Sequence, residues 1–103
     1  MKVDFTFDRD KVEQQGYTVD AVHQTIKQHF AAKGLRCVED GETLSFMDNG
    51  RENDFSSMWA ILMALLRSNW FTLFASSCTW HDDDGSLEDV LSQAWKVQGR
   101  TTA

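Results

Sequence analysis

The chain has 103 residues, of which 42% are apolar and 25% charged, the mixture typical of one soluble globular domain. Its formal net charge of −6 disfavours both binding to nucleic acid through a basic patch and docking to an anionic membrane surface. The longest apolar run, residues 58–66, is shorter than the roughly 20 residues that span a bilayer. Two cysteines and an N-terminus without an apolar leader predict a cytoplasmic protein with free thiols.

The first two elements follow from hydrophobic periodicity. Residues 2–7, KVDFTF, alternate apolar and polar side chains, which predicts a half-buried strand. Apolar residues then recur at helical spacing over residues 19–33 and predict an amphipathic helix. Thr18 suits the N-cap of this helix, and Gly34 suits the position just past its C-terminus.

A hairpin is predicted over residues 35–47, LRCVEDGETLSFM, because Asp40-Gly41 is a typical type I′ turn between two strand-like runs. Such a turn fixes the register of the two strands. The pairs that it implies are Glu39 with Glu42, Cys37 with Leu44, and Leu35 with Phe46.

Three further elements complete the chain. A second helix is expected from about Phe55 to Ser68, with Asn53 or Asp54 as its N-cap. Residues 70–80, WFTLFASSCTW, read as a strand with apolar groups on both faces. A third helix is predicted from residue 86 to 97, because Ser86 and Asp89 resemble a capping box.

This order resembles the ferredoxin-like fold, in which βαββαβ elements form an antiparallel sheet of spatial order 4-1-3-2 with two helices on one face. We therefore expect an α+β domain of that type over residues 1–97, extended by a C-terminal helix, and a frayed tail over residues 98–103. The resemblance covers residues 2–80 and concerns the fold alone, because many unrelated functions share this scaffold.

The stretch CTWHDDDGS, residues 78–86, raises the question of a metal site, since Cys78 and His81 have the spacing of half a zinc site. The predicted sheet places Cys37 on its opposite edge, roughly 14 Å away by strand spacing, too far to share a metal or a disulfide with Cys78. Consecutive aspartates do not converge on a calcium ion. We expect no metal site, no cofactor and no catalytic residues, and interpret His23 as a structural helix histidine.

The supply of large apolar side chains exceeds what two helices on one sheet face require, which indicates an interface. The leading hypothesis is a non-enzymatic protein–protein interaction or regulatory module, with a homodimer or a protein partner. Its candidate contacts, with acidic side chains steering a basic partner, are Phe74, Trp80, Asp82, Asp83, Asp84, Leu91 and Trp95. The alternatives are a small-molecule sensor with an aromatic pocket between the sheet and the C-terminal helix, and an acidic inhibitor that imitates nucleic acid.

Overall fold

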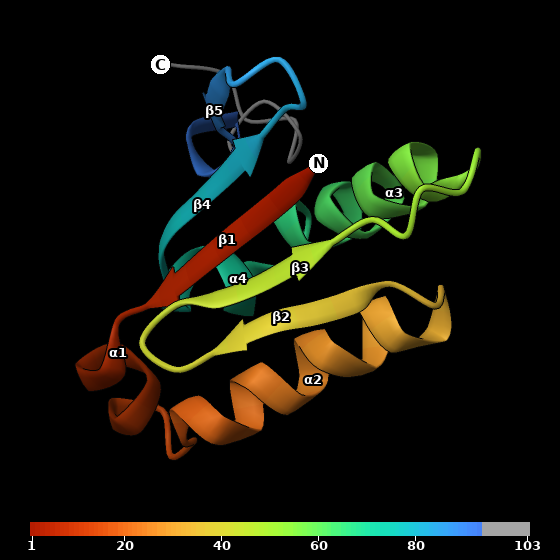
Figure 1. The fold of residues 1–103 in the computed structure, drawn as a ribbon. Helices are drawn as coiled ribbons and strands as arrows, with labels where there is room; N and C mark the ends of the chain where they lie inside the picture. Colours follow the sequence, from red (N-terminus) through yellow and green to blue (C-terminus); the bar gives the residue numbers. More distant parts are fainter. Residues whose placement is uncertain (94–103) are drawn as a thin grey trace.

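A five-stranded antiparallel sheet forms the centre of the computed structural model, which describes residues 1–93. Its strand order is β2-β3-β1-β4-β5, so the first strand lies in the middle (Figure 1). The strands are β1 (Lys2–Phe7), β2 (Arg36–Asp40), β3 (Leu44–Met47), β4 (Ala75–His81) and β5 (Leu87–Asp89). The helices are α1 (Arg9–Gln14), α2 (Val19–Ala32), α3 (Asp54–Leu66), α4 (Asn69–Phe74) and a short 3₁₀ turn, η1 (Leu91–Gln93).

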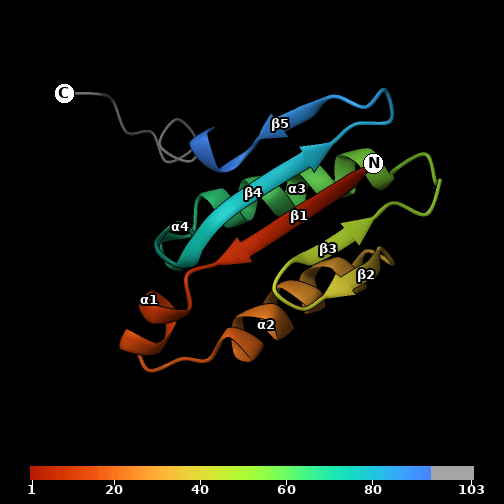
Figure 2. The ribbon, with the colours of Figure 1, turned by 60° about the vertical axis from the view of Figure 1, so that its left-hand side comes forward.

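The core lies between one face of the sheet and the helices α2 and α3, which cover that face side by side (Figure 2). Alternation in β1 turns Val3 and Phe5 into the core, as predicted, and both are fully buried. The ring of Phe30 on α2 stacks on the ring of Phe46 on β3, with centroids 4.0 Å apart. Burial of each such phenylalanine contributes about 1.5–3 kcal/mol to stability, so this layer joins helix and sheet firmly.

Helix α2 confirms the sequence prediction at both ends. The side chain of Thr18 accepts a hydrogen bond from the backbone amide of Ala21, as an N-cap does. At the other end, Gly34 has a φ of +70°, a left-handed conformation that suits glycine because it has no Cβ. The amide of Leu35 then bonds back to the carbonyl of Phe30, which closes the last turn.

Helix α3 begins one residue before the predicted start and ends at Leu66. Asn53 occupies the N-cap position, but its side chain makes no capping hydrogen bond. The buried carboxylate of Asp54 instead accepts from the backbone amides of Asn49 and Arg51. Burial opposes the charge, yet these amides and the Arg51 guanidinium outweigh it and keep the pKa of Asp54 below its ordinary value.

The α+β class and the antiparallel sheet are confirmed, but the ferredoxin-like βαββαβ description is wrong. The connection after β1 holds two helices, the connection after β3 holds two more, and a fifth strand follows β4. No C-terminal helix forms within the described part of the predicted segment. Residues 87–93 form β5 and η1 because β5 provides partners for the free backbone groups of β4. Residues 94–97 of the predicted helix and the tail 98–103 lie outside the described residues.

The predicted strand over residues 70–80 is wrong in its first half. Residues 69–74 form α4, and only Ala75 begins the strand. Phe71 and Phe74, three residues apart, both turn into the core as helical neighbours do. Local strand propensity is outweighed here, because a helix buries these two rings together.

The hairpin exists, but its predicted register is wrong. Cys37 pairs with Phe46 and Asp40 pairs with Leu44, with a bulge after Cys37. Gly41 lacks the positive φ that a type I′ turn requires. β2 lies at the edge of the sheet and is exposed along its whole length, including Cys37.

Candidate functional site

The cysteine and histidine of the CTWHDDDGS stretch point to opposite faces of the sheet. Cys78 is buried in the core, where it pairs with Phe5 of β1. His81 lies on the other face, where its Nε2 is 2.6 Å from a carboxylate oxygen of Asp4. Cys37 is separated from Cys78 by two strands, and both thiols are free. Within residues 1–93, no group of three His, Cys, Asp or Glu side chains is placed to hold a metal ion.

The three aspartates form the turn between β4 and β5, and their hydrogen bonds differ. Asp83 accepts a hydrogen bond from the amine of Met1 at 2.6 Å, which raises the pKa of that amine. Asp84 accepts from the hydroxyl and the amide of Ser86, and these bonds lower the pKa of Asp84. The backbone of Asp82 closes the turn by bonding with Ser86 and Gly85. Asp82 lines a hollow on the surface.

That hollow has a volume of about 360 Å³ and lies where α3 begins, beside the turn between β4 and β5. We call it the Trp groove, after the two tryptophans in its lining. Its lining residues are Phe55, Trp59, Trp80, Asp82, Ser86, Leu87 and Glu88.

Two tryptophans and one phenylalanine form the aromatic part of the Trp groove. Trp80 of β4 is almost fully buried, and its ring centroid is 5.1 Å from that of Trp59 on α3. Phe55 meets Trp80 edge to face, with centroids 5.9 Å apart. The indole Nε1 of Trp59 is buried and has no hydrogen-bond partner among the described residues. Such a buried donor is uncommon in a folded protein.

The rim of the Trp groove combines exposed apolar surface with acidic groups. Phe55 is 51% exposed and Leu87 is 64% exposed, and the two side chains line the same groove. Asp82 and Glu88 line the same groove. Neither carboxylate forms an ion pair with any residue in the range 1–93. The groove therefore offers an apolar contact area beside two carboxylates that have no ion-pair partner within the described range.

The structure brings together only part of the predicted contact set. Trp80 and Asp82 line the Trp groove, whereas Phe74 ends α4, where it is buried and lines a different cavity. Leu91 lies in η1, half-buried against the core. Trp95 falls outside the described residues.

Two residues of the Trp groove, Phe55 and Leu87, are not among the predicted contacts. Phe55 lies in the first turn of α3, where the core no longer covers it. Leu87 lies within the segment predicted as a helix and instead is exposed on the edge strand β5. Only the exposure of Phe55 at a helix start carried a signal in the sequence, since end positions of an apolar stripe are the least covered.

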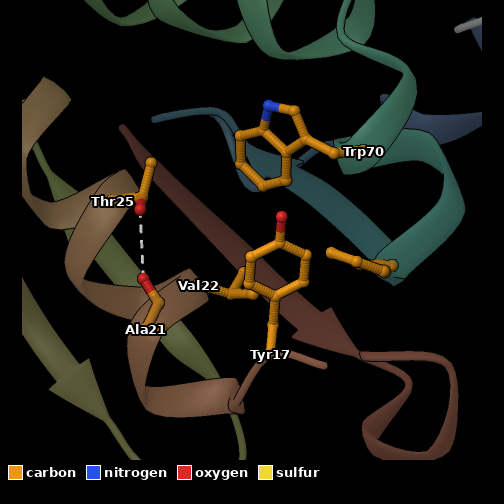
Figure 3. A pocket seen from close by; sticks show the side chains of 6 residues that line it. Tyr17, Ala21, Val22, Thr25 and Trp70 are labelled. Atoms are coloured by element: carbon orange, nitrogen blue, oxygen red, sulfur yellow. Dashed lines mark hydrogen bonds between the residues drawn. The ribbon is translucent and has the colours of Figure 1, made fainter. Parts of the chain in front are cut away.

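The aromatic pocket expected between the sheet and a C-terminal helix is not the one observed. A cavity of about 370 Å³ lies instead between α2 and α4, under the segment that joins α1 to α2 (Figure 3). We call it the α2–α4 cavity. Its lining residues are Tyr17, Ala21, Val22, Thr25, Trp70 and Phe74.

His23 has a carboxylate partner that its own helix could not supply. Asp40 at the end of β2 lies 2.8 Å from His23 Nδ1 and 2.8 Å from the Nζ of Lys27. The ammonium of Lys27, followed by His23, lowers the pKa of Asp40. The cluster fastens α2 to the hairpin, which supports the structural interpretation of His23.

The open face of the sheet carries polar side chains from β1, β3 and β4. Asp4 at its centre bonds to His81 and to the hydroxyl of Ser45, and Thr6 bonds to Ser77 of β4. No helix in the described part of the chain is long and apolar enough to cross a bilayer. In comparisons with known proteins, no family model, no curated protein and no solved structure matches this chain.

Proposed function

We propose that the protein is an interaction module, and that its Trp groove binds a short basic segment of a partner protein carrying a large apolar side chain. The observation that carries this proposal is the position of exposed Phe55 and Leu87 beside two tryptophans and two carboxylates that form no ion pair within residues 1–93. Interface centres are enriched in aromatic residues, and their rims are polar.

The apolar part of the groove would supply most of the affinity. An aliphatic or aromatic side chain of the partner would lie on the rings of Phe55 and Trp59 and bury Leu87 at the same time.

The charged part would select the partner. Asp82 and Glu88 line the groove, and the chain as a whole has a net charge of −6. Lysine or arginine beside the apolar anchor is therefore attracted and an acidic segment repelled, mainly through the association rate. Asp83 contributes less to this attraction than Asp82 and Glu88, because the Met1 amine already compensates its charge.

Three synthetic hexapeptides test the proposal by fluorescence anisotropy, each with blocked ends and a terminal dye. They are KRFLKR, its acidic analogue EEFLEE, and KRSGKR, which lacks the apolar pair. We expect saturable binding of KRFLKR in the micromolar range that weakens as salt is added, and at least tenfold weaker binding of the other two. Equal binding of the acidic and basic peptides would contradict the proposed selection.

Protein variants locate the binding. Leu87→Ala and the pair Asp82→Asn/Glu88→Gln should each weaken KRFLKR at least fivefold. Val38→Ala is the matched control, because Val38 is 45% exposed on β2 at the other edge of the sheet. A loss in Val38→Ala as large as in Leu87→Ala would overturn the assignment. Sedimentation equilibrium tests whether the groove instead binds a second copy of this chain. A dimer of the free protein that the Leu87→Ala substitution dissociates would show that it does.

A further inference from the structure

We infer that the α2–α4 cavity is a second binding site, separate from the Trp groove, for a small neutral aromatic molecule. The inference does not depend on the proposed function. The volume of about 370 Å³ falls within the range of known small-molecule sites, roughly 300–1,000 Å³, and suits a ligand of two or three aromatic rings.

Three aromatic rings form the walls of the cavity. Tyr17 comes from the connection before α2, whereas Trp70 and Phe74 come from α4. Phe74 meets Tyr17 with centroids 6.0 Å apart at 61°, and it meets Trp70 at 6.5 Å and 55°. The rings are therefore tilted against each other rather than stacked flat, an arrangement that can surround a planar guest on more than one side.

The polar groups of the cavity leave little choice of ligand chemistry. None of the six lining residues is Asp, Glu, Lys, Arg or His, so a charged ligand would lose its hydration without gaining a counter-charge. The hydroxyl of Thr25 already donates to the carbonyl of Ala21, at 3.1 Å. The hydroxyl of Tyr17 makes no hydrogen bond among the described residues and points toward the Trp70 indole (Figure 3). One neutral polar group on the ligand can pair with it.

The position of the cavity also distinguishes it from a packing fault. Its bottom is firm, because Val22 and Phe74 are buried in the core. Its mouth is open, because Tyr17 is 58% exposed and Ala21 is exposed on the first turns of α2. A ligand can thus enter without unfolding of either helix.

The probe for this site is N-phenyl-1-naphthylamine, which is neutral, aromatic and fluorescent in apolar surroundings. We expect a saturable fluorescence increase, with at least tenfold weaker binding of the anionic analogue 1-anilinonaphthalene-8-sulfonate. In ¹⁵N-labelled protein, the neutral probe should shift the Trp70 indole resonance and leave those of Trp59 and Trp80 in place. Shifts at Trp59 and Trp80 alone, or equal affinity for the two probes, would overturn the inference.

Ala21→Leu should fill the cavity and weaken the neutral probe at least tenfold, because Ala21 lines the cavity at an exposed helix position. Ala31→Leu is the matched control, with the same change at an exposed position near the other end of α2, and should bind as the natural chain does. Tyr17→Ala provides a second variant that removes a wall without touching the core. Unchanged binding in both Ala21→Leu and Tyr17→Ala would refute the site. Concentration-dependent shifts at Trp70 without probe would also refute it, since a second copy would then cover the cavity.

Discussion

The indole rings of Trp59 and Trp80 lie 5.1 Å apart at an angle of 45°, one carried by α3 and the other by β4. Trp80 is 3% exposed, so it belongs to the core and to the Trp groove at once. Trp59 is only half-buried. The groove is therefore built on the core itself, and its aromatic part cannot be removed without cost to stability.

We predict that Trp80→Ala lowers the free energy of unfolding by about 3–5 kcal/mol, as truncation of a large buried side chain does. Leu87→Ala should change it by less than about 0.5 kcal/mol, because Leu87 is mostly exposed. Urea unfolding followed by circular dichroism measures both. Similar small losses for the two variants would mean that Trp80 is not part of the core. Because of this difference, Leu87→Ala and not Trp80→Ala tests binding.

Two glycines should respond in opposite ways to alanine. Gly34→Ala forces a Cβ into the left-handed region, 2.8 Å from Nη1 of Arg51, and should cost about 1–2 kcal/mol. Gly41→Ala has no positive φ and nothing within 4 Å of the new Cβ, so it should be neutral or slightly stabilising. Thermal unfolding of the two variants checks this. A cost for Gly41→Ala like that of Gly34→Ala would indicate a type I′ turn in the hairpin after all.

On the open face, Asp4→Ala removes the acceptor of both Ser45 and His81. The hydroxyl of Ser45 is fully buried, and loss of its close partner leaves only Glu39 at 3.5 Å. We expect a loss of about 1–3 kcal/mol in urea unfolding, the cost of a buried group left unsatisfied. Glu52→Ala, at an exposed carboxylate, is the control and should change stability little. An equal effect in the two variants would mean that the Asp4 cluster is not a structural network.

The Asp40 cluster should make stability depend on pH in the acid range. The hydrogen bond from Lys27, then that from His23, lowers the pKa of Asp40 in the folded chain from the ordinary 3.8. The stabilisation is therefore complete above that value and is lost as the pH falls through the lower, folded pKa. Because the Asp40 side chain is 40% exposed, the contribution is less than about 1 kcal/mol. Urea unfolding between pH 7 and pH 3 should show a shallower decline for Asp40→Asn. An identical decline would mean that Asp40 contributes nothing.

The two thiols should react differently in the folded protein. Cys37 is exposed on β2, whereas Cys78 is fully buried and its pKa is raised by desolvation. Titration with dithiobis-nitrobenzoate should detect one thiol in the native protein and both after denaturation. The variant Cys37→Ser should leave no reactive thiol until the chain unfolds. Two reactive thiols in the native protein, or none, would contradict the exposure of Cys37 and the burial of Cys78.

The central elements of the fold could be predicted because their local signals agree with their burial. The apolar side chains that alternate in β1 and those that recur at helical spacing in α2 are the ones buried in the core. Phe5 and Phe30 meet there, with ring centroids 6.0 Å apart. The cap of Thr18 and the turn at Gly34 are formed by residues next to the helix. Such short-range interactions are present in any fold that contains the segment.

Residues 69–74 and 87–93 were predicted wrongly because their local signals do not decide between helix and strand. Aromatic residues favour strands, yet Phe71 and Phe74 pack together only from a helix. The segment after Gly85 has the pattern of a helix start, yet β4 needs backbone partners along its free edge, and β5 supplies them.

For the candidate sites, the sequence by itself determined the supply of aromatic and acidic side chains and the polar character of the open face. Only the tertiary structure decided which of them meet. The Trp groove joins α3 to the turn after β4, and the α2–α4 cavity joins residues 17–25 to residues 70–74. Contacts between segments so distant in the chain depend on strand register and helix placement, which the backbone pairing and the burial of the whole core determine together.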